Sequence, residues 1–475
     1  MPFESMDDFI GAAEAVGEVK HIHGASLERD VGCLTELFYE KDGPVLMFDG
    51  FEGYPEGFRV CANAVRTTRH LALAFGLPLD AHKFDVARHI RDRRRGEPIP
   101  PRVVTDGPVL EYVQDGNAVD VEAFPTPLWH KGDGGRYIGT ADMVVHRDPD
   151  SGYVNVAVYR AMVQGRDRVS LWMNPQKHGN IIAQRYWEKN EAAPVAVVVG
   201  CEPVTWLAAP NLLPFGKSEY DLAGSLRGSP VDVIELPVTG LPVPAHAEIV
   251  LEGEIPPPSE ETAYEGPFGE WPGYYSHEGP ECVVRIKRIY HRHNPIIVGQ
   301  PPMRPKVDPE VNFQVWDHLE RSGITDVTGV WSVCNNLLLV ISLRQRYAGH
   351  AKQALITAAG FRHGDMKTYF LAVDDDIDAS NLGEVLWAMC TRVDPTTDID
   401  VLRDSWTADL DPRIPPQKRK ENDLTAGRCL IDATKPFAWK DRFPKSNMWS
   451  REDRSAVERQ YQDLLAKLDL TKGRA

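Results

Sequence analysis

The spacing of apolar residues over positions 1–115 predicts a small α/β region. Ser5 stands three residues before Asp8, which is the arrangement of a helix N-terminal cap, and Asp30–Tyr39 has the apolar spacing of a second helix. Boundary residues predict two further elements, a strand within Pro44–Phe51 and a helix within Ala62–Phe75. Alternating helical and strand patterns are typical of the α/β class.

Residues 116–305 change to short apolar runs separated by turn residues. The strongest turn signal, Asp148-Pro149-Asp150-Ser151-Gly152, lies between the runs Tyr137–His146 and Tyr153–Met162 and predicts a hairpin. Further strands are expected over Val169–Met173, Val195–Val199, His246–Leu251, Cys282–Tyr290 and Pro295–Val298, with helices over His178–Trp187 and Glu219–Leu226. Mostly antiparallel strands with few helices favour a small barrel that can hold one ligand.

The pattern alternates again over residues 306–449 and predicts a second α/β domain. Its expected elements are the apolar run Ser332–Leu343, a helix over His350–Ala359, a strand over Thr368–Val373 and a helix over Asn381–Arg392. The tail, 450–475, carries one helical apolar stripe made of Val457, Tyr461, Leu464, Leu465 and Leu468. Such a stripe packs on a partner subunit or on its own domain, and the sequence leaves both open.

Composition narrows the class of protein. A chain of 475 residues exceeds one hydrophobic core, and its net charge of −16 argues against a nucleic-acid partner. Seven scattered cysteines without CxxC spacing indicate reduced thiols rather than disulfides. The N-terminus lacks the basic start and apolar core of a signal peptide, and no apolar run approaches the ~18 residues of a membrane span. A cytoplasmic location without membrane contact is expected.

Two carboxylates stand in an unusual setting in the stretch Glu265–Tyr275. Glu265 and Glu270 are separated by Gly, Pro and Phe, and Trp and Tyr residues follow. A carboxyl group in partly apolar surroundings has a raised pKa, so two such groups can hold different protonation states near neutral pH. A Gly/Pro hairpin with two solvated acids explains the same residues, and the stretch alone does not choose.

Four more polar residues stand against apolar context. Asn155 and Arg160 lie five positions apart in a strand pattern, so strict alternation puts them on opposite faces unless a bulge or turn intervenes. His178 and Glu219 each open a predicted helix. Asn155, His178 and Glu219 together form a ligand set suited to Mn²⁺ or Mg²⁺, although each is also a common cap or buried structural group. GxGxxG, GxxxxGK, HExxH and GxSxG are missing from the sequence.

In order and spacing, these motifs resemble the UbiD family of decarboxylases. The resemblance rests on Asn155 with Val158-Tyr159-Arg160, His178, Ser218-Glu219-Tyr220 and Glu265-Gly266-Pro267-Phe268-Gly269-Glu270, and it continues into Val373–Asp378 and Leu386-Trp387-Ala388-Met389. It implies an α+β fold in which a split β-barrel domain binds prenylated FMN over 116–305. An N-terminal α/β region, 1–115, and a C-terminal α/β oligomerisation domain, 306–449, would flank that domain, and 450–475 would form a helical tail.

The resemblance also implies roles for single residues. Asn155, His178 and Glu219 would coordinate a divalent metal, Mn²⁺ or Mg²⁺, on the cofactor phosphate. A K⁺ ion held by main-chain carbonyls is a further implication, with Ala208–Asn211 as the candidate segment. The flavin-contacting positions would be Val158, Tyr159, Arg160, Trp172, Met173 and Lys177. Lys177 departs from the Gln or Arg that relatives carry, so its own role is open.

The implied activity is reversible, non-oxidative decarboxylation of an aromatic, heteroaromatic or α,β-unsaturated acid, with release of CO₂. Loss of CO₂ from an sp² carbon needs an electron sink that side chains do not supply, so a cofactor must carry it. Arg160 would pair with ionised Glu265, and Glu270 would return a proton to carbon. A purely structural Arg160–Glu265 ion pair is the alternative.

The implied partners are the carboxylic acid substrate, a flavin prenyltransferase that supplies the cofactor, and further copies of the chain in a homodimer or larger homo-oligomer. Two other functions remain open, a non-catalytic carrier of the flavin and a structural subunit of a multisubunit carboxylase. The Pro-rich segment Gln300–Lys306 carries Arg304 and Lys306. These cations would bind a second carboxylate or a phosphate, or mark a domain junction.

Overall fold

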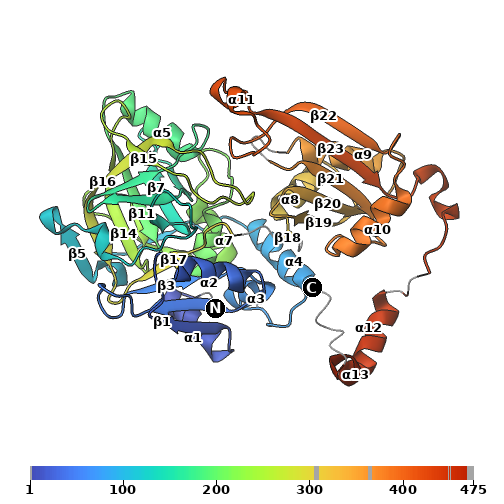
Figure 1. The fold of residues 1–475 in the computed structure, drawn as a ribbon, viewed down its shortest axis with the longest axis horizontal. Coiled ribbons are helices and arrows are strands. Elements are labelled where there is room, and N and C mark those ends of the chain that lie inside the picture. The colour runs from blue at the N-terminus through green and yellow to red at the C-terminus, as the bar shows by residue number, and fades with distance from the viewer. Residues whose placement is uncertain (1–2, 304–309, 362–365, 448, 450, 468–475) are drawn as a thin grey trace. The chain divides into compact units, whose positions relative to one another are not determined.

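The computed structural model describes residues 3–303, 310–361, 366–447, 449 and 451–467 (Figure 1). Contacts along the chain divide it into two compact units, Met1–Arg304 and Pro305–Ala475. The segment with Arg304 and Lys306 lies outside the described residues, so their expected role is not addressed by the structure.

A four-stranded sheet in the first unit combines the N-terminus with a strand from much later in the chain. Its order is β1 (Val19–His23), β2 (Val45–Asp49), β3 (Arg59–Ala62) and β17 (Ile296–Gly299). The accompanying helices are α1 (Met6–Ala15), α2 (Asp30–Tyr39), α3 (Thr68–Ala74) and α4 (Lys83–Arg94). Strand β17, which the sequence pattern grouped with the barrel strands, instead pairs in parallel with β3.

Two of the helices predicted for this region have the expected start or bounds. Ser5 and Asp8 form the expected capping box at α1, and α2 has the predicted bounds. The helix expected within Ala62–Phe75 is too long in that prediction, because Ala62 ends β3 and the side chain of Thr67 caps a helix that starts only at Thr68.

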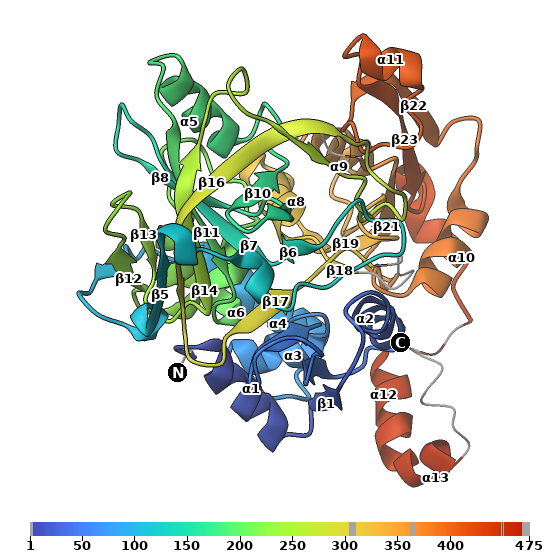
Figure 2. The same cartoon turned by 60° about the vertical axis from the view of Figure 1, so that its left-hand side comes forward.

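A ten-stranded sheet forms most of the rest of the first unit. Along it the strands run β6-β9-β10-β16-β14-β11-β7-β8, and β5 and β15 also pair with β16. The strands are β5 (Tyr112–Asp115), β6 (Tyr137–Gly139), β7 (Asp142–Arg147), β8 (Val154–Ala157), β9 (Ala161–Gly165), β10 (Arg168–Leu171), β11 (Ala193–Val199), β14 (Ile249–Ile255), β15 (Ala263–Glu265) and β16 (Gly279–His291). Figure 2 shows β16 as a long curved strand, and its 13 residues join four partners.

Smaller elements complete the first unit. A three-stranded sheet has the order β13 (Pro242–Pro244), β12 (Asp232–Glu235) and β4 (Arg102–Val103). Three helices, α5 (His178–Trp187), α6 (Pro203–Ala208) and α7 (Glu219–Arg227), follow strands of the large sheet or precede β12. Single 3₁₀ turns occupy Pro108–Leu110, Gly116–Ala118 and Val121–Ala123. Helix α5 has its predicted bounds, and Gly228 ends α7 in a left-handed conformation as expected.

The predicted hairpin is present, but each of its arms breaks into two strands. The turn at Asp148–Gly152 joins β7 to β8, which pair in the antiparallel sense. Strands β6 and β9, which the prediction merged with β7 and β8, pair with each other at the far end of the sheet path. Residues 158–160 therefore leave the strand between β8 and β9, which is the turn needed between Asn155 and Arg160. The strand predicted over His246–Leu251 is shifted, because β14 starts at Ile249.

The core of the first unit lies against the large sheet. Fully buried residues on neighbouring strands belong to one continuous apolar cluster that includes Val144, Val197, Leu251 and Ile289. At roughly 25 cal/mol per Å² of apolar surface, burial of such side chains is the main stabilising contribution. Among the described strands the pairing path is open between β6 and β8, so barrel closure stays a prediction.

The second unit alternates strands and helices, which agrees with the mixed α/β character expected from the sequence. Its six-stranded sheet has the order β18 (Glu310–Val311), β19 (Val327–Val333), β20 (Leu338–Leu343), β21 (Tyr369–Asp374), β23 (Thr425–Ala433) and β22 (Ile399–Trp406). The helices are α8 (Phe313–Arg321), α9 (His350–Ala359), α10 (Leu382–Arg392) and α11 (Pro416–Lys420), and a 3₁₀ segment spans Phe437–Arg442. The apolar run Ser332–Leu343 is a β19–β20 hairpin rather than one element.

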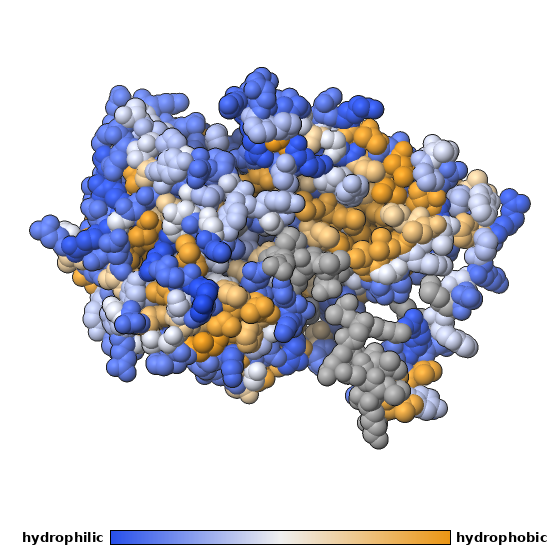
Figure 3. Space-filling model, viewed as in Figure 1, coloured by the Kyte–Doolittle hydropathy of each residue, from blue (hydrophilic) through white to orange (hydrophobic). Residues whose placement is uncertain are grey.

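The second unit exposes large apolar side chains. Figure 3 shows a broad apolar area over this unit, whose exposed hydrophobic residues include Ile356, Tyr369, Leu386, Trp387 and Val401. The tail forms α12 (Arg451–Gln460) and α13 (Gln462–Lys467), while Ser450 and Leu468 of the predicted tail lie outside the described residues. Over the described part of the chain, no helix is both long and apolar enough to cross a bilayer.

Candidate active site

Arg160, in the turn between β8 and β9, contacts both carboxylates of the Glu265–Tyr275 stretch. Its Nε and Nη2 donate to Oε1 and Oε2 of Glu265, each at 2.8 Å, which is a bidentate ion pair. Its Nη1 donates to Glu270 Oε1 at 2.5 Å. One guanidinium therefore donates to two carboxylates, and it does so through each of its three nitrogens.

Tyr137, on β6, is a further partner of Glu265. Its hydroxyl donates to Glu265 Oε1 at 2.7 Å, and burial raises the pKa of Tyr137, which keeps the hydroxyl in its donor form. Glu265 thus accepts three hydrogen bonds inside the protein, two of them from a cation. Such contacts hold the Glu265 carboxylate in one orientation.

Glu270 has a different environment. It accepts one bond from Arg160, and its side chain is only 10% exposed. Burial raises the pKa of Glu270, and the attraction of Arg160 opposes that rise without cancelling it. The two carboxylates around Arg160 are therefore divided into one that is fully hydrogen-bonded and one that retains a proton more readily.

Aromatic rings cover the guanidinium. The Arg160 carbon Cζ lies 4.8 Å from the centre of the Trp172 ring and 5.6 Å from that of Phe268, and the ring of Tyr137 lies 4.2 Å from Phe268. The two contacts of Arg160 are cation–π interactions, and the three rings together exclude water. The stretch thus holds buried acids rather than the solvated acids of the alternative reading.

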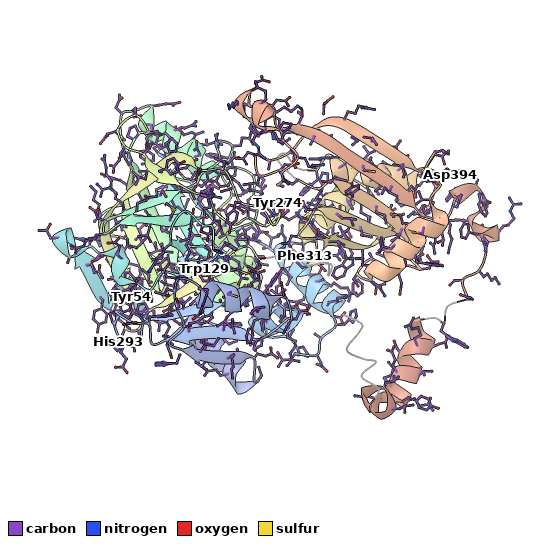
Figure 4. All side chains as sticks on the ribbon, in the orientation of Figure 1. Tyr54, Trp129, Tyr274, His293, Phe313 and Asp394 are labelled. Atoms are coloured by element: carbon purple, nitrogen blue, oxygen red, sulfur yellow. The ribbon has the colours of Figure 1, made fainter. Side chains whose placement is uncertain are left out.

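The loop that carries Glu270 is a short hairpin. Glu265 ends β15, Phe268 N donates to Ser276 Oγ at 3.1 Å, and Glu270 N donates to the Tyr274 carbonyl at 3.0 Å. Tyr274, labelled in Figure 4, lies at the tip and is exposed. The hairpin therefore turns Glu270 inward while its tip faces solvent.

The three expected metal ligands also come together. Glu219, at the first turn of α7, accepts from Asn155 Nδ2 at 3.3 Å and from Val156 N at 2.8 Å through Oε2. The Tyr153 hydroxyl links the set, because Asn155 Nδ2 donates to it at 3.3 Å and His178 Nδ1 lies 3.4 Å from it. A carboxylate, an amide and an imidazole from three separate elements thus share one small region.

The chemistry of this cluster suits a divalent cation. Asn155 Oδ1 is buried and accepts no hydrogen bond, which is unusual for a buried acceptor. Burial raises the pKa of Glu219 to about 7 and lowers that of His178. Two oxygen donors and one neutral nitrogen donor match the ligands that Mn²⁺ accepts. Within the described chain no group of three or more His, Cys, Asp or Glu residues could hold a metal, and the present set differs in that it includes an amide.

The other residues predicted to contact the flavin lie in residues 158–160, just after β10, or just before α5. Val158 and Trp172 are half-buried, and Met173 and Tyr159 are buried. Lys177 precedes α5, whose N-terminus has no side-chain cap, and Gly179 N at that end donates to the Tyr159 hydroxyl at 3.1 Å. An uncapped helix N-terminus beside a lysine is suited to a phosphate group.

The candidate K⁺ segment follows α6. The carbonyls of Leu207 and Ala208 accept from Asn211 Nδ2 at 2.7 and 3.0 Å. The K⁺ expectation stays a prediction. Sequence reasoning missed Tyr137 and Tyr153, because a tyrosine in a strand pattern is typical of a core and no motif marks its hydroxyl.

Family models match the chain almost from end to end. The N-terminal, Rift-related and C-terminal domains of 3-octaprenyl-4-hydroxybenzoate carboxy-lyase match residues 10–90, 102–305 and 311–433. The chain belongs to the UbiD family. Membership of the UbiD family makes it a carboxy-lyase.

Relatives and solved structures agree with this assignment. The chain is 30% identical to the phenolic acid decarboxylase of Bacillus subtilis over 92% of its own length and 94% of the relative's. It is 32% identical to the pyrrole-2-carboxylic acid decarboxylase of Pseudomonas aeruginosa over 82% and 83%. The UbiD-class enzyme HmfF from Pelotomaculum thermopropionicum, solved in complex with FMN, covers 94% of the chain and 98% of its own at 25% identity and a TM-score of 0.82.

Proposed function

We propose that this UbiD-family chain decarboxylates an aromatic or heteroaromatic acid with prenylated FMN bound beside Arg160. The observation that carries the proposal is the buried guanidinium shared by two carboxylates in unequal environments. Similarity to decarboxylases of phenolic and pyrrole-2-carboxylic acids supports the substrate class. When bound, the modified flavin supplies the electron sink that cleavage at an sp² carbon requires.

The residues of the chain then have separate tasks. Arg160 offers positive charge at the site, and Glu265 with Tyr137 fixes its orientation. Glu270 holds the proton that the product carbon needs after CO₂ leaves, because its raised pKa keeps it protonated at higher pH than an exposed glutamate. Trp172 and Phe268 exclude water from these groups.

The cofactor phosphate would bind at the start of α5. Support comes from the uncapped N-terminus next to Lys177 and from the adjacent set Asn155, His178 and Glu219, which would hold Mn²⁺ or Mg²⁺ against the phosphate oxygens. The flavin ring would lie along the turn 158–160 in a split barrel built by the ten-stranded sheet. A K⁺ ion near Ala208–Asn211 belongs to the same proposal.

Activity of the chain by itself tests the function. We expect the protein, coexpressed with a flavin prenyltransferase and purified, to release CO₂ from hydroxycinnamic, hydroxybenzoic or pyrrole-2-carboxylic acids, and protein made without the transferase to release none. Manometric or coupled detection of CO₂ measures this. Bound flavin without turnover of any acid would favour a carrier, and activity only with added subunits would favour a component of a multisubunit carboxylase.

Variants of the metal set test the phosphate site. We expect Asn155→Ala and Glu219→Gln to lose both metal and flavin, because these side chains would hold the cation that secures the cofactor phosphate. Loss of a residue that only supports a metal ligand typically weakens metal binding about 10–100-fold, so loss of a ligand itself should weaken it at least as much. Inductively coupled plasma mass spectrometry and flavin absorbance measure occupancy. Glu235→Gln, an exposed change in β12, is the control. Full occupancy by both metal and flavin in Asn155→Ala and Glu219→Gln would contradict the assignment of the metal ligands.

The apolar surface of the second unit supports self-association. Tyr369, Leu386 and Trp387 expose large apolar area on one unit of the chain, and such areas commonly mark interfaces. Val457 and Leu464 of the tail are exposed as well, and each of these apolar groups is suited to contact with a second copy of this chain. A homodimer or larger homo-oligomer is accordingly part of the proposal.

A further inference from the structure

A second loop, residues 130–135, lies against the loop that carries Glu270. His130 follows Trp129, which is labelled in Figure 4 and whose Nε1 donates to the Tyr137 carbonyl at 2.9 Å. Gly134 N donates to the Pro267 carbonyl at 2.7 Å. A methyl group on Gly134 would lie 1.9 Å from the Gly266 carbonyl oxygen, so only glycine allows the two backbones to approach this closely.

Asp133 connects this loop to the residue before Glu270. Its side chain is completely buried, and Oδ1 accepts from Gly269 N at 2.9 Å. Oδ2 accepts from His130 N at 2.8 Å. A buried carboxylate that binds a backbone amide fixes that amide strongly, because the alternative is an unpaired charge in a dry environment. The position of Gly269, and with it Glu270, therefore depends on Asp133.

The ring of His130 faces acceptors on both sides. Its Nδ1 lies 3.2 Å from both carboxylate oxygens of Asp133, and its Nε2 lies 2.5 Å from the Pro302 carbonyl oxygen. Neither a carboxylate nor a carbonyl can donate, so both ring nitrogens must carry protons to make these bonds. A neutral imidazole has only one N–H. The geometry therefore requires an imidazolium.

Electrostatics agrees with the geometry. Burial by itself lowers the pKa of His130, but the contact with Asp133 and the charge of Glu36 outweigh it, and the net pKa is raised. The ring also lies against Phe268 at 5.4 Å between centres, edge to face. A methyl group on Gly269 would lie 2.5 Å from the His130 ring, so the ring occupies the space directly beside the Glu270 loop.

We propose that His130 is a doubly protonated imidazolium that, with Asp133, forms a positioning pair for the loop carrying Glu270. Its effect on catalysis rests on the proposed function, whereas its effect on the loop does not. The pair contacts no reacting group and acts through the Gly269 amide. Loss of the pair would move the proton donor relative to Arg160, and displacement of about 1 Å can cost about 10²-fold in rate.

Two substitutions of His130 separate its two contacts. In His130→Asn the amide nitrogen replaces ring Nδ1 and still donates to Asp133, while in His130→Gln the amide nitrogen replaces Nε2 and reaches only Pro302. Asp133→Asn removes the charge and one acceptor. His293→Gln, an exposed histidine of the same unit, is the control.

Hydrogen exchange of the peptide spanning 265–275, followed by mass spectrometry, measures the protection of the backbone amides in the Glu270 loop and requires no turnover. We expect faster exchange in His130→Gln and Asp133→Asn, and exchange close to the control in His130→Asn. In the holoenzyme we expect kcat at least about tenfold lower for the first two variants, KM within about threefold, and unchanged flavin content. His130→Asn should retain kcat within about threefold.

Proton-detected spectra of ¹⁵N-histidine-labelled protein test whether the His130 ring is positively charged. The ring signals lost in His130→Asn should show protons on both nitrogens at pH 8. Exchange and kcat equal to the control in all variants, equal impairment of His130→Asn and His130→Gln, or a single ring proton at pH 8 would each overturn the proposal. If the unmodified chain releases no CO₂ from any acid, the exchange and ¹⁵N data still decide the positioning pair, and only the proposed function fails.

Discussion

Replacing Glu270 by Gln should lower kcat by about 10²- to 10⁴-fold, which is the usual contribution of a positioned general acid. Gln keeps the size of the side chain and an oxygen that accepts from Arg160 Nη1, but it has no proton to transfer. Flavin content should stay at the level of the unmodified protein, because Glu270 is not among the residues proposed to bind the metal and the cofactor phosphate. Steady-state CO₂ release and flavin absorbance measure the two effects.

The pH dependence provides a second measure of the same residue. Burial raises the pKa of Glu270, so the protonated form persists at higher pH than in an exposed glutamate and is lost as pH rises through that pKa. We expect kcat of the unmodified enzyme to fall on the alkaline side and this fall to be absent in Glu270→Gln. Glu278→Gln, an exposed change on the same loop, is the control. Near-normal turnover of Glu270→Gln would refute the proton-donor role.

Replacing Arg160 by Ala should destabilise the protein as well as abolish turnover. The change leaves Glu265 and Glu270 without their cation in a buried setting, since the Glu265 side chain is 1% exposed. Removal of one partner of a buried pair typically lowers the free energy of unfolding by about 3–5 kcal/mol. Denaturant titration of the cofactor-free protein, followed by tryptophan fluorescence, measures this loss.

Two further arginine substitutions test whether the destabilisation comes from the buried ion pair of Arg160. Arg166→Ala removes an ion pair with Asp120 whose side chains are 59% and 31% exposed, and such a pair contributes at most about 1 kcal/mol. Arg160→Lys keeps the charge but cannot donate in parallel to both oxygens of Glu265, so it should restore part of the stability and little of the turnover. Equal destabilisation by Arg160→Ala and Arg166→Ala would contradict the structural part of the argument.

Helices and hairpins whose ends are marked by nearby capping, glycine or turn residues could be predicted from the sequence. Ser5 and Asp8 mark the start of α1, and Gly360 marks the end of α9, because capping and glycine residues define helix ends locally. Helix α5 also has the predicted bounds, although it carries no side-chain cap. The hairpin at Asp148–Gly152 follows from its turn residues in the same way. Strand ends were less predictable, and the apolar runs around β6 to β9 were merged because a tight turn inside an apolar run leaves little trace in composition.

The candidate site was predicted only in part, because some of its residues stand in motifs and others are distinguished only by contacts with distant residues. Arg160, Glu265 and Glu270 could be named from their motifs, and the structure brings their side chains together. Their roles remain proposals. Tyr137 and Asp133 were missed, since a strand tyrosine and a loop aspartate each have common structural explanations, and only their contacts with Glu265 and Gly269 distinguish them.

The sequence by itself determined the α/β character of both ends, the strand-rich middle, the family and the acidic residues on which the proposed chemistry depends. Tertiary structure alone decided that β17 joins the N-terminal sheet, that Tyr137 reaches Glu265 across 128 positions, and that His130 and Asp133 hold the Glu270 loop. The physical reason is that helix caps and turns act over a few residues. Contacts between distant residues depend on strand register and on close backbone approach, which no local pattern of apolar and polar positions records.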